Sequence, residues 1–494
     1  MQGTSSLKDK AAFGVKWMGI SRITVIGIEF VRLSILAHLL IPDDFGLLGM
    51  LMVVIGFAQA FGDMGVSNAI IYHQDDNREI LSSLYWVTMI TGLVVFILVW
   101  AGTPLVVNYY KETRLTELMF WVSLIFIITP IGQQFQMLLQ KEFEFDSLAK
   151  IEIGSAALGT IAAILLALMG WGVLSLIWGL LVSTVTKALL CVLYGWKIWR
   201  PKLHFKKDDL KGYISFGLYQ MGERSVNYFS SNVDFLIIGR FLGAEILGIY
   251  TVAYRLVTMP ISKLNPAITR VAFPIFAKKQ SDDSALSRGY IETIKLISLI
   301  ACPLLIGLAV TSPLLVPLLF GEEWASAIYL IQILTLLGIM RVLADPTGSV
   351  LLAKGRADIC FKINAVIALI NTVVFWYFVQ YGVYAIAWSF AILCFFYLIT
   401  WMIVLHFIIN MRLIEYMSVL IKPIMMSLIM GATLILCYIL LSKTSLNKIA
   451  FLSGLIVLGM VEYILMTLAF EKDFLRNMWK IFFIKKKELN NTRI

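Results

Sequence analysis

The chain has 494 residues, of which 60% are hydrophobic and only 15% are charged, and its formal net charge is +10. So much apolar surface excludes a water-soluble protein of this size and makes the lipid bilayer the expected solvent. Membrane topology and contact with inner-leaflet lipids explain the positive charge, so nucleic acid is a poor candidate for a partner.

A helix needs roughly 20 mostly apolar residues to cross a hydrocarbon core about 30 Å thick. The hydropathy pattern meets this requirement fourteen times, with no globular domain between the segments. The sequence therefore predicts an all-α polytopic membrane protein. In chain order, the expected spans are 12–38, 45–68, 80–106, 116–138, 146–169, 172–195, 211–238, 246–272, 288–311, 325–352, 359–379, 383–407, 418–441 and 448–470.

The first span follows Lys8 and Lys10 without a small-residue cleavage site, which indicates a retained helix and not a signal peptide. An even number of spans places both termini on one side of the membrane. Positive residues in short loops are retained in the cytoplasm, and they concentrate in the segments on that side. We therefore expect both termini, a basic linker at 196–210 and a basic tail at 471–494 to be cytoplasmic.

Comparison of the chain with itself, at an offset of about 200 to 215 residues, brings fragments into register. The fragment LLIPDDFGLL aligns with FLGAEILGIY, which pairs Gly46 with Gly248, and the same offset pairs Arg22 with Arg224. The fragment GVLSLIW aligns with GVYAIAW and pairs Trp178 with Trp388. A duplicated transporter with a cavity between its two halves is the expected source of such a pattern.

The repeat divides the chain into two parallel six-helix lobes at 1–195 and 211–410, joined by the linker at 196–210. The helices within 411–470 have no counterpart and form an extra pair. Five cysteines lack any CxxC spacing, and four histidines lack the spacing of a metal site. We therefore expect no metal and no cofactor.

Several local stretches carry a family likeness. They are GFAQAFGDMGVSNAII (56–71), PIGQQFQMLLQKEFEF (130–145), SKLNPAITRVAFPIFAKKQSDD (262–283), FGEEW (320–324) and DPTGSVLLAKGRADICFKIN (345–364). With these stretches the chain resembles the polysaccharide transport branch of the multidrug/oligosaccharidyl-lipid/polysaccharide (MOP) flippase superfamily, and within it the colanic-acid exporter type.

This resemblance implies a flippase of the bacterial inner membrane and not an enzyme. Its cargo would be an undecaprenyl-diphosphate-linked oligosaccharide, moved between the leaflets by alternating access. Membrane lipids, a polysaccharide polymerase and chain-length machinery are the partners that it suggests. A cation-coupled multidrug antiporter of the same superfamily is the main alternative and should have an acidic, aromatic cavity. A scaffold for polysaccharide assembly that transports nothing is a third.

Charged residues inside spans cost roughly 2.5 to 3.5 kcal/mol each and are functional candidates by default. Arginine binds phosphate through paired, charge-assisted hydrogen bonds, which suits a diphosphate headgroup. The candidate substrate-binding residues are Arg22, Arg32, Arg224 and Arg255. Acids that could pair with them or couple binding to movement are Glu29, Glu223 and Asp234.

These assignments have structural alternatives. Each arginine could instead be neutralised by a neighbouring acid and hold helices together. Arg341 and Asp345 have the i,i+4 spacing that is more often a structural pair. Gln133 and Gln134 could contact sugar hydroxyls, or they could lie in water at the inner membrane boundary.

Overall fold

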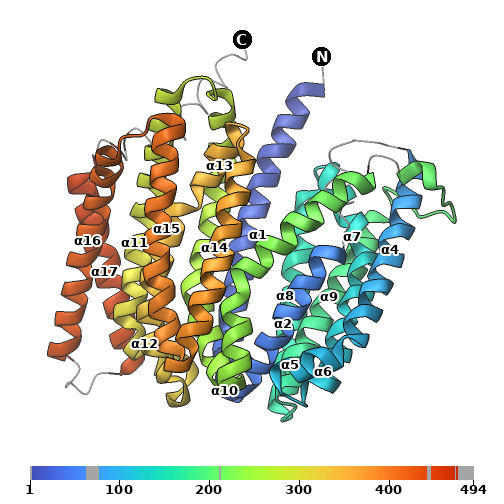
Figure 1. The fold of residues 1–494 in the computed structure, drawn as a ribbon, viewed down its shortest axis with the longest axis horizontal. Helices are drawn as coiled ribbons and strands as arrows, with labels where there is room; N and C mark the ends of the chain where they lie inside the picture. Colours follow the sequence, from blue (N-terminus) through green and yellow to red (C-terminus); the bar gives the residue numbers. More distant parts are fainter. Residues whose placement is uncertain are drawn as a thin grey trace. The chain divides into compact units, whose positions relative to one another are not determined.

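The computed structural model describes residues 3–62, 77–210, 213–441 and 447–472, together with residues 474 and 476. Within these residues the chain is helical and contains no β-strand, as the sequence predicts. Figure 1 shows the helices in chain order from blue to red. They are α1 Gly3–Leu39, α2 Pro42–Gly62, α4 Arg78–Ala101, α5 Thr103–Tyr110, α6 Leu115–Ser123, α7 Ile125–Lys141, α8 Phe145–Leu168, α9 Val173–Gly195, α10 Tyr213–Lys278, α11 Asp283–Phe320, α12 Ser326–Ala344, α13 Pro346–Ala353, α14 Ala357–Phe378, α15 Val383–Ile409, α16 Leu413–Leu441 and α17 Lys448–Phe470, with short 3-10 helices at Lys207–Leu210, Glu322–Trp324 and Val379–Tyr381.

Twelve helical segments of the described chain are long and apolar enough to cross a membrane. The long helix α10 counts once among them although it contains two predicted spans, and α1 is the remaining predicted span. The fourth span is α6 followed by α7, and the tenth is α12 followed by α13. The third span ends earlier than expected, because Gly102 and Pro104 end α4 and begin the separate short helix α5.

The chain reverses direction inside α10. The Tyr250 hydroxyl donates a 2.7 Å hydrogen bond to the Asp234 carboxylate, yet a continuous helix would separate residues 16 apart by about 24 Å. The turn lies at Gly243, whose φ of 85° belongs to the left-handed region that glycine tolerates best. We call residues 213–242 the first limb of α10 and residues 244–278 its second limb.

The described chain forms two compact units. The first comprises Met1–Thr251, Leu319–Glu323 and Ile363–Ile386, and the second comprises Val252–Leu318, Trp324–Lys362 and Ala387–Ile494. The lobes at 1–195 and 211–410, and the superposition of the two repeats, stay predictions.

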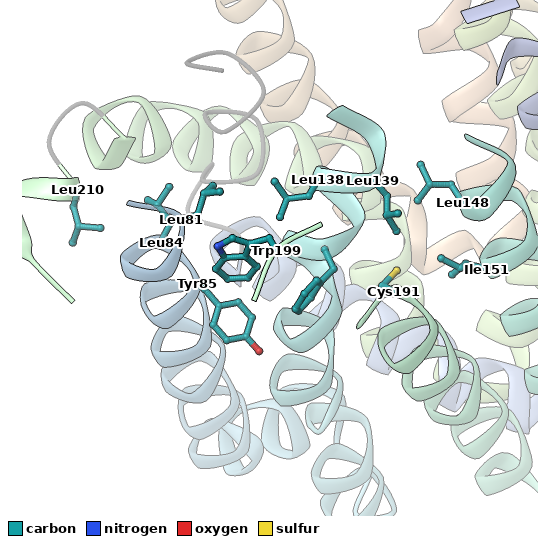
Figure 2. Close-up of a cluster of buried hydrophobic side chains, with 11 residues drawn as sticks. Leu81, Leu84, Tyr85, Leu138, Leu139, Leu148, Ile151, Cys191, Trp199 and Leu210 are labelled. Carbon is teal, nitrogen blue, oxygen red and sulfur yellow. The ribbon is translucent and has the colours of Figure 1, made fainter. Parts of the chain in front are cut away.

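In the first unit, apolar side chains of α4, α7, α8 and α9 form a core that includes the linker (Figure 2). Trp199 of the linker is only 3% exposed. Its ring lies 5.7 Å from that of Tyr85 and 5.4 Å from that of Phe135, measured between ring centroids. Leu210 joins the same core at the other end of the linker. The linker between the predicted lobes is therefore packed against helices α4 and α7.

Two glycines allow α2 to touch the second limb of α10. A Cβ atom on Gly46 would lie 1.7 Å from the Ala244 carbonyl oxygen, and one on Gly248 would lie 1.8 Å from the Pro42 carbonyl oxygen and 2.9 Å from the Gly46 nitrogen. These neighbours are backbone atoms, which cannot rotate aside as a side chain does. The crossing therefore requires glycine at both positions.

In the second unit, the extra helices α16 and α17 pack against α11 through an apolar cluster that contains Leu299, Met430 and Leu455. Glu471, at the end of α17, forms ion pairs with Lys295 of α11 and Lys422 of α16. Apolar packing and charge together attach the extra helix pair to the unit.

Candidate functional site

A cavity of about 580 Å³ lies inside the first unit, between α2, α7 and the first limb of α10. Its volume is within the usual range for a small-molecule site. The residues that line it are Gly56, Gln59, Ala60, Gly62, Ile125, Phe126, Thr129, Pro130, Gln133, Asn227, Tyr228 and Ser231.

Each helix presents one face to the cavity, because residues three and four apart lie on the same side of a helix. On α2 this face carries Gln59 beside Gly56 and Ala60. On α7 it carries Thr129 and Gln133, one turn apart. These polar side chains stand on spans that are otherwise apolar, so the polarity is concentrated where the three helices converge.

Tyr228 crosses from the first limb of α10 to α2. Its hydroxyl donates a 2.9 Å hydrogen bond to the Met52 carbonyl oxygen, and its own carbonyl accepts a 2.8 Å bond from the Asn232 amide. Gly56 provides the room, since a Cβ atom there would lie 2.2 Å from the Tyr228 ring. The ring is thereby fixed as one wall of the cavity.

Gln134 sets the rotation of α7. Its amide nitrogen donates a 2.7 Å hydrogen bond to the Leu81 carbonyl oxygen of α4, and the side chain is buried. A helix turns by about 100° per residue, so this anchor on one face leaves Gln133 on another. Of the two predicted glutamines, Gln133 lines the cavity and Gln134 joins two helices.

Six polar groups line the cavity: two glutamines, an asparagine, a threonine, a serine and a tyrosine. No charged side chain is among the described lining residues. Amides and hydroxyls both donate and accept hydrogen bonds, as sugar hydroxyls do. Within the described ranges, no three His, Cys, Asp or Glu side chains gather so that they could hold a metal ion. The cavity suits a neutral, hydroxyl-rich ligand.

The predicted charged residues of the first span lie on α1, in the first unit. Arg22, Glu29 and Arg32 are all half-buried, and Glu29 attracts Arg32 electrostatically. Beside them, the Ser21 hydroxyl donates a 3.0 Å bond to Glu152 of α8. None of these side chains belongs to the described lining of the cavity, so their contact with substrate stays a prediction.

The seventh and eighth spans hold four further candidates. The side chains of Glu223 and Arg224 lie outside the described residues. Asp234 is 1% exposed and accepts the Tyr250 hydroxyl bond that joins the two limbs of α10. Arg255 lies on the second limb, in the second unit, and its side chain is exposed.

Arg341 and Asp345 belong to a polar cluster in the second unit. The Arg341 guanidinium donates a 2.6 Å hydrogen bond to the Tyr254 hydroxyl. Asp345 accepts a 2.5 Å bond from the Asn265 amide. Both bonds connect the tenth span to the second limb of α10, and the role of Arg341 and Asp345 stays a prediction.

Sequence reasoning missed five polar residues of the cavity: Gln59, Thr129, Asn227, Tyr228 and Ser231. The available signal was polarity on one helical face within an apolar span, which a search for charges overlooks.

Sequence reasoning also missed two carboxylates within spans. Glu152 accepts the Ser21 bond described above, and Glu462 of α17 accepts a 2.9 Å bond from the Thr433 hydroxyl of α16. Both satisfy the requirement that an acid inside a membrane have a polar partner.

Residues 35–329, more than half of the chain, match a family model described as "Polysaccharide biosynthesis protein". The chain belongs to the polysaccharide biosynthesis protein family. One relative is the teichuronic acid biosynthesis protein TuaB of Bacillus subtilis (strain 168). It is 36% identical over 427 residues, which cover 86% of this chain and 88% of TuaB. The lipopolysaccharide biosynthesis protein WzxC of Escherichia coli (strain K12) is 36% identical over 359 residues, or 73% of each chain.

Solved structures agree with this membership at the level of the fold. The lipid II flippase MurJ, in an inward closed conformation, matches this family member with a TM-score of 0.73 at 14% identity, over 94% of this chain and 100% of MurJ. An inward-facing multidrug transporter of the MATE family, within the MOP superfamily, matches with a TM-score of 0.56 at 15% identity, over 86% and 99% of the two chains. The predicted relation to polysaccharide transport proteins is confirmed at the level of the polysaccharide biosynthesis family, and the solved structures show that this chain shares the fold of MurJ and the MATE transporter.

Proposed function

We propose that the protein is a flippase that carries a lipid-linked oligosaccharide across the bacterial cytoplasmic membrane during polysaccharide biosynthesis. The observation that carries this proposal is the polar, uncharged cavity inside the first unit of a chain from the polysaccharide biosynthesis family. The names of TuaB and WzxC support a role in the biosynthesis of surface polymers, and the succinoglycan biosynthesis transport protein ExoT of Rhizobium meliloti (strain 1021) adds transport by its name.

In the proposed mechanism, Gln59, Gln133 and Asn227 bind hydroxyl groups of the sugar while the lipid tail stays among the bilayer lipids. Hydrogen bonds to amides replace those that water provided, which lowers the cost of moving the sugar through the membrane. Alternating access between two lobes would expose the sugar first to the cytoplasm and then to the outside. The protein then performs no covalent chemistry on its cargo.

The finer assignments extend this proposal. Arg22, Arg32, Arg224 and Arg255 are proposed to hold the undecaprenyl diphosphate, with Glu29, Glu223 and Asp234 as partners that exchange when it binds or leaves. Both termini and the linker at 196–210 are proposed to face the cytoplasm. A polysaccharide polymerase and chain-length machinery are proposed to receive the exported unit.

The multidrug antiporter alternative predicted an acidic, aromatic cavity. Phe126 and Tyr228 supply aromatic rings, but the described lining contains no carboxylate. Because a cationic drug needs a negative partner when it leaves water, this cavity favours the neutral sugar.

Export of surface polysaccharide tests the proposal in a strain that depends on this protein. Gln133→Ala combined with Asn227→Ala should reduce polymer at the cell surface and cause lipid-linked units to accumulate in the membrane. Gln140→Ala is the matched control, because Gln140 is exposed near the end of the same helix α7. Normal export by the double variant, at normal expression, would refute the cavity as the sugar site.

The proposed diphosphate site has its own test. Arg22→Ala and Arg224→Ala should each abolish export while the protein still inserts, and lysine should restore export only in part because it lacks the planar fork of arginine. Resistance to cationic drugs should not change in any of these variants. A loss of drug resistance with normal export would instead favour the antiporter.

A further inference from the structure

The linker presents a basic and apolar loop on the surface of the first unit. We call residues 200–207 the docked loop. Leu203 is 96% exposed and Phe205 is 49% exposed. Lys202, Lys206 and Lys207 flank them and are exposed as well. A leucine almost wholly outside the fold, among three lysines, contributes nothing to the core of the protein.

Hydrogen bonds hold the base of this loop against α4. The Trp86 indole donates a 2.8 Å bond to the Lys202 carbonyl oxygen. The Ser83 hydroxyl donates a 2.6 Å bond to the Asp209 carboxylate and accepts a 3.2 Å bond from the Lys206 backbone nitrogen. His204 lies 3.1 Å from the same carboxylate. These bonds fix the backbone of the loop against α4, while the side chains of Leu203 and Phe205 remain exposed.

These contacts also place the loop near one end of the candidate span of α4. The candidate span of α4 begins at Arg78, and a helix rises about 1.5 Å per residue. The Ser82 hydroxyl accepts a 3.2 Å hydrogen bond from the Lys202 backbone nitrogen. Ser82 and Trp86 lie about 6 and 12 Å along α4 from its beginning, so the loop contacts the end of the span that is nearer to the expected headgroup region. Trp196, exposed at the end of α9, is the kind of aromatic residue that marks this boundary.

We propose that the docked loop inserts Leu203 and Phe205 into the edge of an anionic lipid leaflet, while Lys202, Lys206 and Lys207 contact the lipid phosphates. Apolar residues between lysines at a membrane surface combine burial in the acyl boundary with attraction to anionic headgroups. The depth of the loop favours lipid over a cytoplasmic protein, because the bilayer already occupies this level. This inference does not depend on the identity of the transported sugar.

Spin-label accessibility in vesicles tests the proposal on the full-length protein. The five native cysteines are replaced by alanine, and a single cysteine is introduced as Leu203→Cys or, separately, as Phe205→Cys. Ser281→Cys, in the exposed polar segment between α10 and α11, is the matched control. The vesicles contain either phosphatidylglycerol with phosphatidylethanolamine or phosphatidylcholine alone.

In the anionic vesicles, we expect labels at positions 203 and 205 to contact oxygen dissolved in lipid and to be shielded from a water-soluble nickel complex. The label at 281 should show the reverse. Each lysine near an anionic surface contributes about a fivefold change in the ratio of inserted to water-exposed loop. The triple change of Lys202, Lys206 and Lys207 to glutamine should therefore remove the difference between the two vesicle types.

Labels at 203 and 205 as accessible to nickel as the label at 281, in anionic vesicles, would overturn the proposal. The same holds if these labels are water-exposed in vesicles but shielded in native membranes, since a protein partner would then cover the loop. Leu203 is so exposed that its replacement cannot disturb the core, so a negative result is not a folding defect.

Discussion

Gly248→Ala tests how closely α2 and the second limb of α10 approach each other. The added methyl group would lie 1.8 Å from the Pro42 carbonyl oxygen, whereas ordinary contact begins at 3.4 Å. The two helices would have to separate by about 1.6 Å. Overpacking of this kind costs about 1–3 kcal/mol, and in domains of 150–250 residues each kcal/mol lowers Tm by about 2–4 °C.

The assay is thermal unfolding of the purified protein in detergent, followed by the loss of its monodisperse peak in size-exclusion chromatography. Gly454→Ala in α17 is the matched control, because a Cβ atom there meets nothing within 4 Å. Alanine is favoured over glycine inside a helix by about 0.5–1 kcal/mol, so the control should keep or slightly raise its Tm. We expect Gly248→Ala to lower Tm by several degrees. Equal stability of the two variants would refute the close crossing.

Three further predictions concern contacts elsewhere in the chain. Gln134→Ala should lower Tm, because loss of its buried bond to Leu81 costs about 1–3 kcal/mol. Gln133→Ala should lower export and leave Tm unchanged. A lower Tm for Gln133→Ala and an unchanged Tm for Gln134→Ala would show that α7 is rotated. Hydrogen bonds from Arg114 lower the pKa of Glu112 from its ordinary value of 4.5. The contact therefore stabilises the fold fully at a pH above 4.5 and weakens as the pH falls through the lowered pKa. Glu112→Gln should reduce the difference in Tm between neutral and acidic pH, and an unchanged difference would contradict this prediction. Glu471→Gln should destabilise the second unit more than Asp358→Asn does, because Glu471 is 4% exposed between two lysines while Asp358 belongs to an exposed pair. Breaking a buried ion pair costs about 3–5 kcal/mol. Equal Tm values for the two variants would show that Glu471 is hydrated.

Hydropathy was enough to predict the spans, because length and apolar composition are local properties of each segment. The predicted spans at 211–238 and 246–272 even leave a gap around Gly243, where α10 turns back. The short helix α5 was missed because Gly102 and Pro104 interrupt an apolar pattern that continues beyond them. The hydropathy of a segment measures only its apolar composition, whereas a single proline can end a helix within an apolar segment.

The site was harder to predict, because it depends on which helical faces converge. Gln133 and Gln134 are adjacent and identical, yet one lines the cavity and the other bonds to α4. Only the packing of α7 against α4 separates their roles. The linker was assigned from its charges alone, and the apolar Trp199 and Leu210 within it were the overlooked signal that it packs into the core.

The contact between Gly46 and Gly248 joins two positions that the internal sequence comparison also pairs. The predicted duplication would place this contact at a twofold axis, where a residue touches its own counterpart as in the isologous interface of a homodimer. In an ancestor of half this length, one glycine would have served both sides of the crossing when two copies met. Under that prediction each half could later change separately, but the crossing still needs glycine at both positions, so neither glycine can be replaced alone.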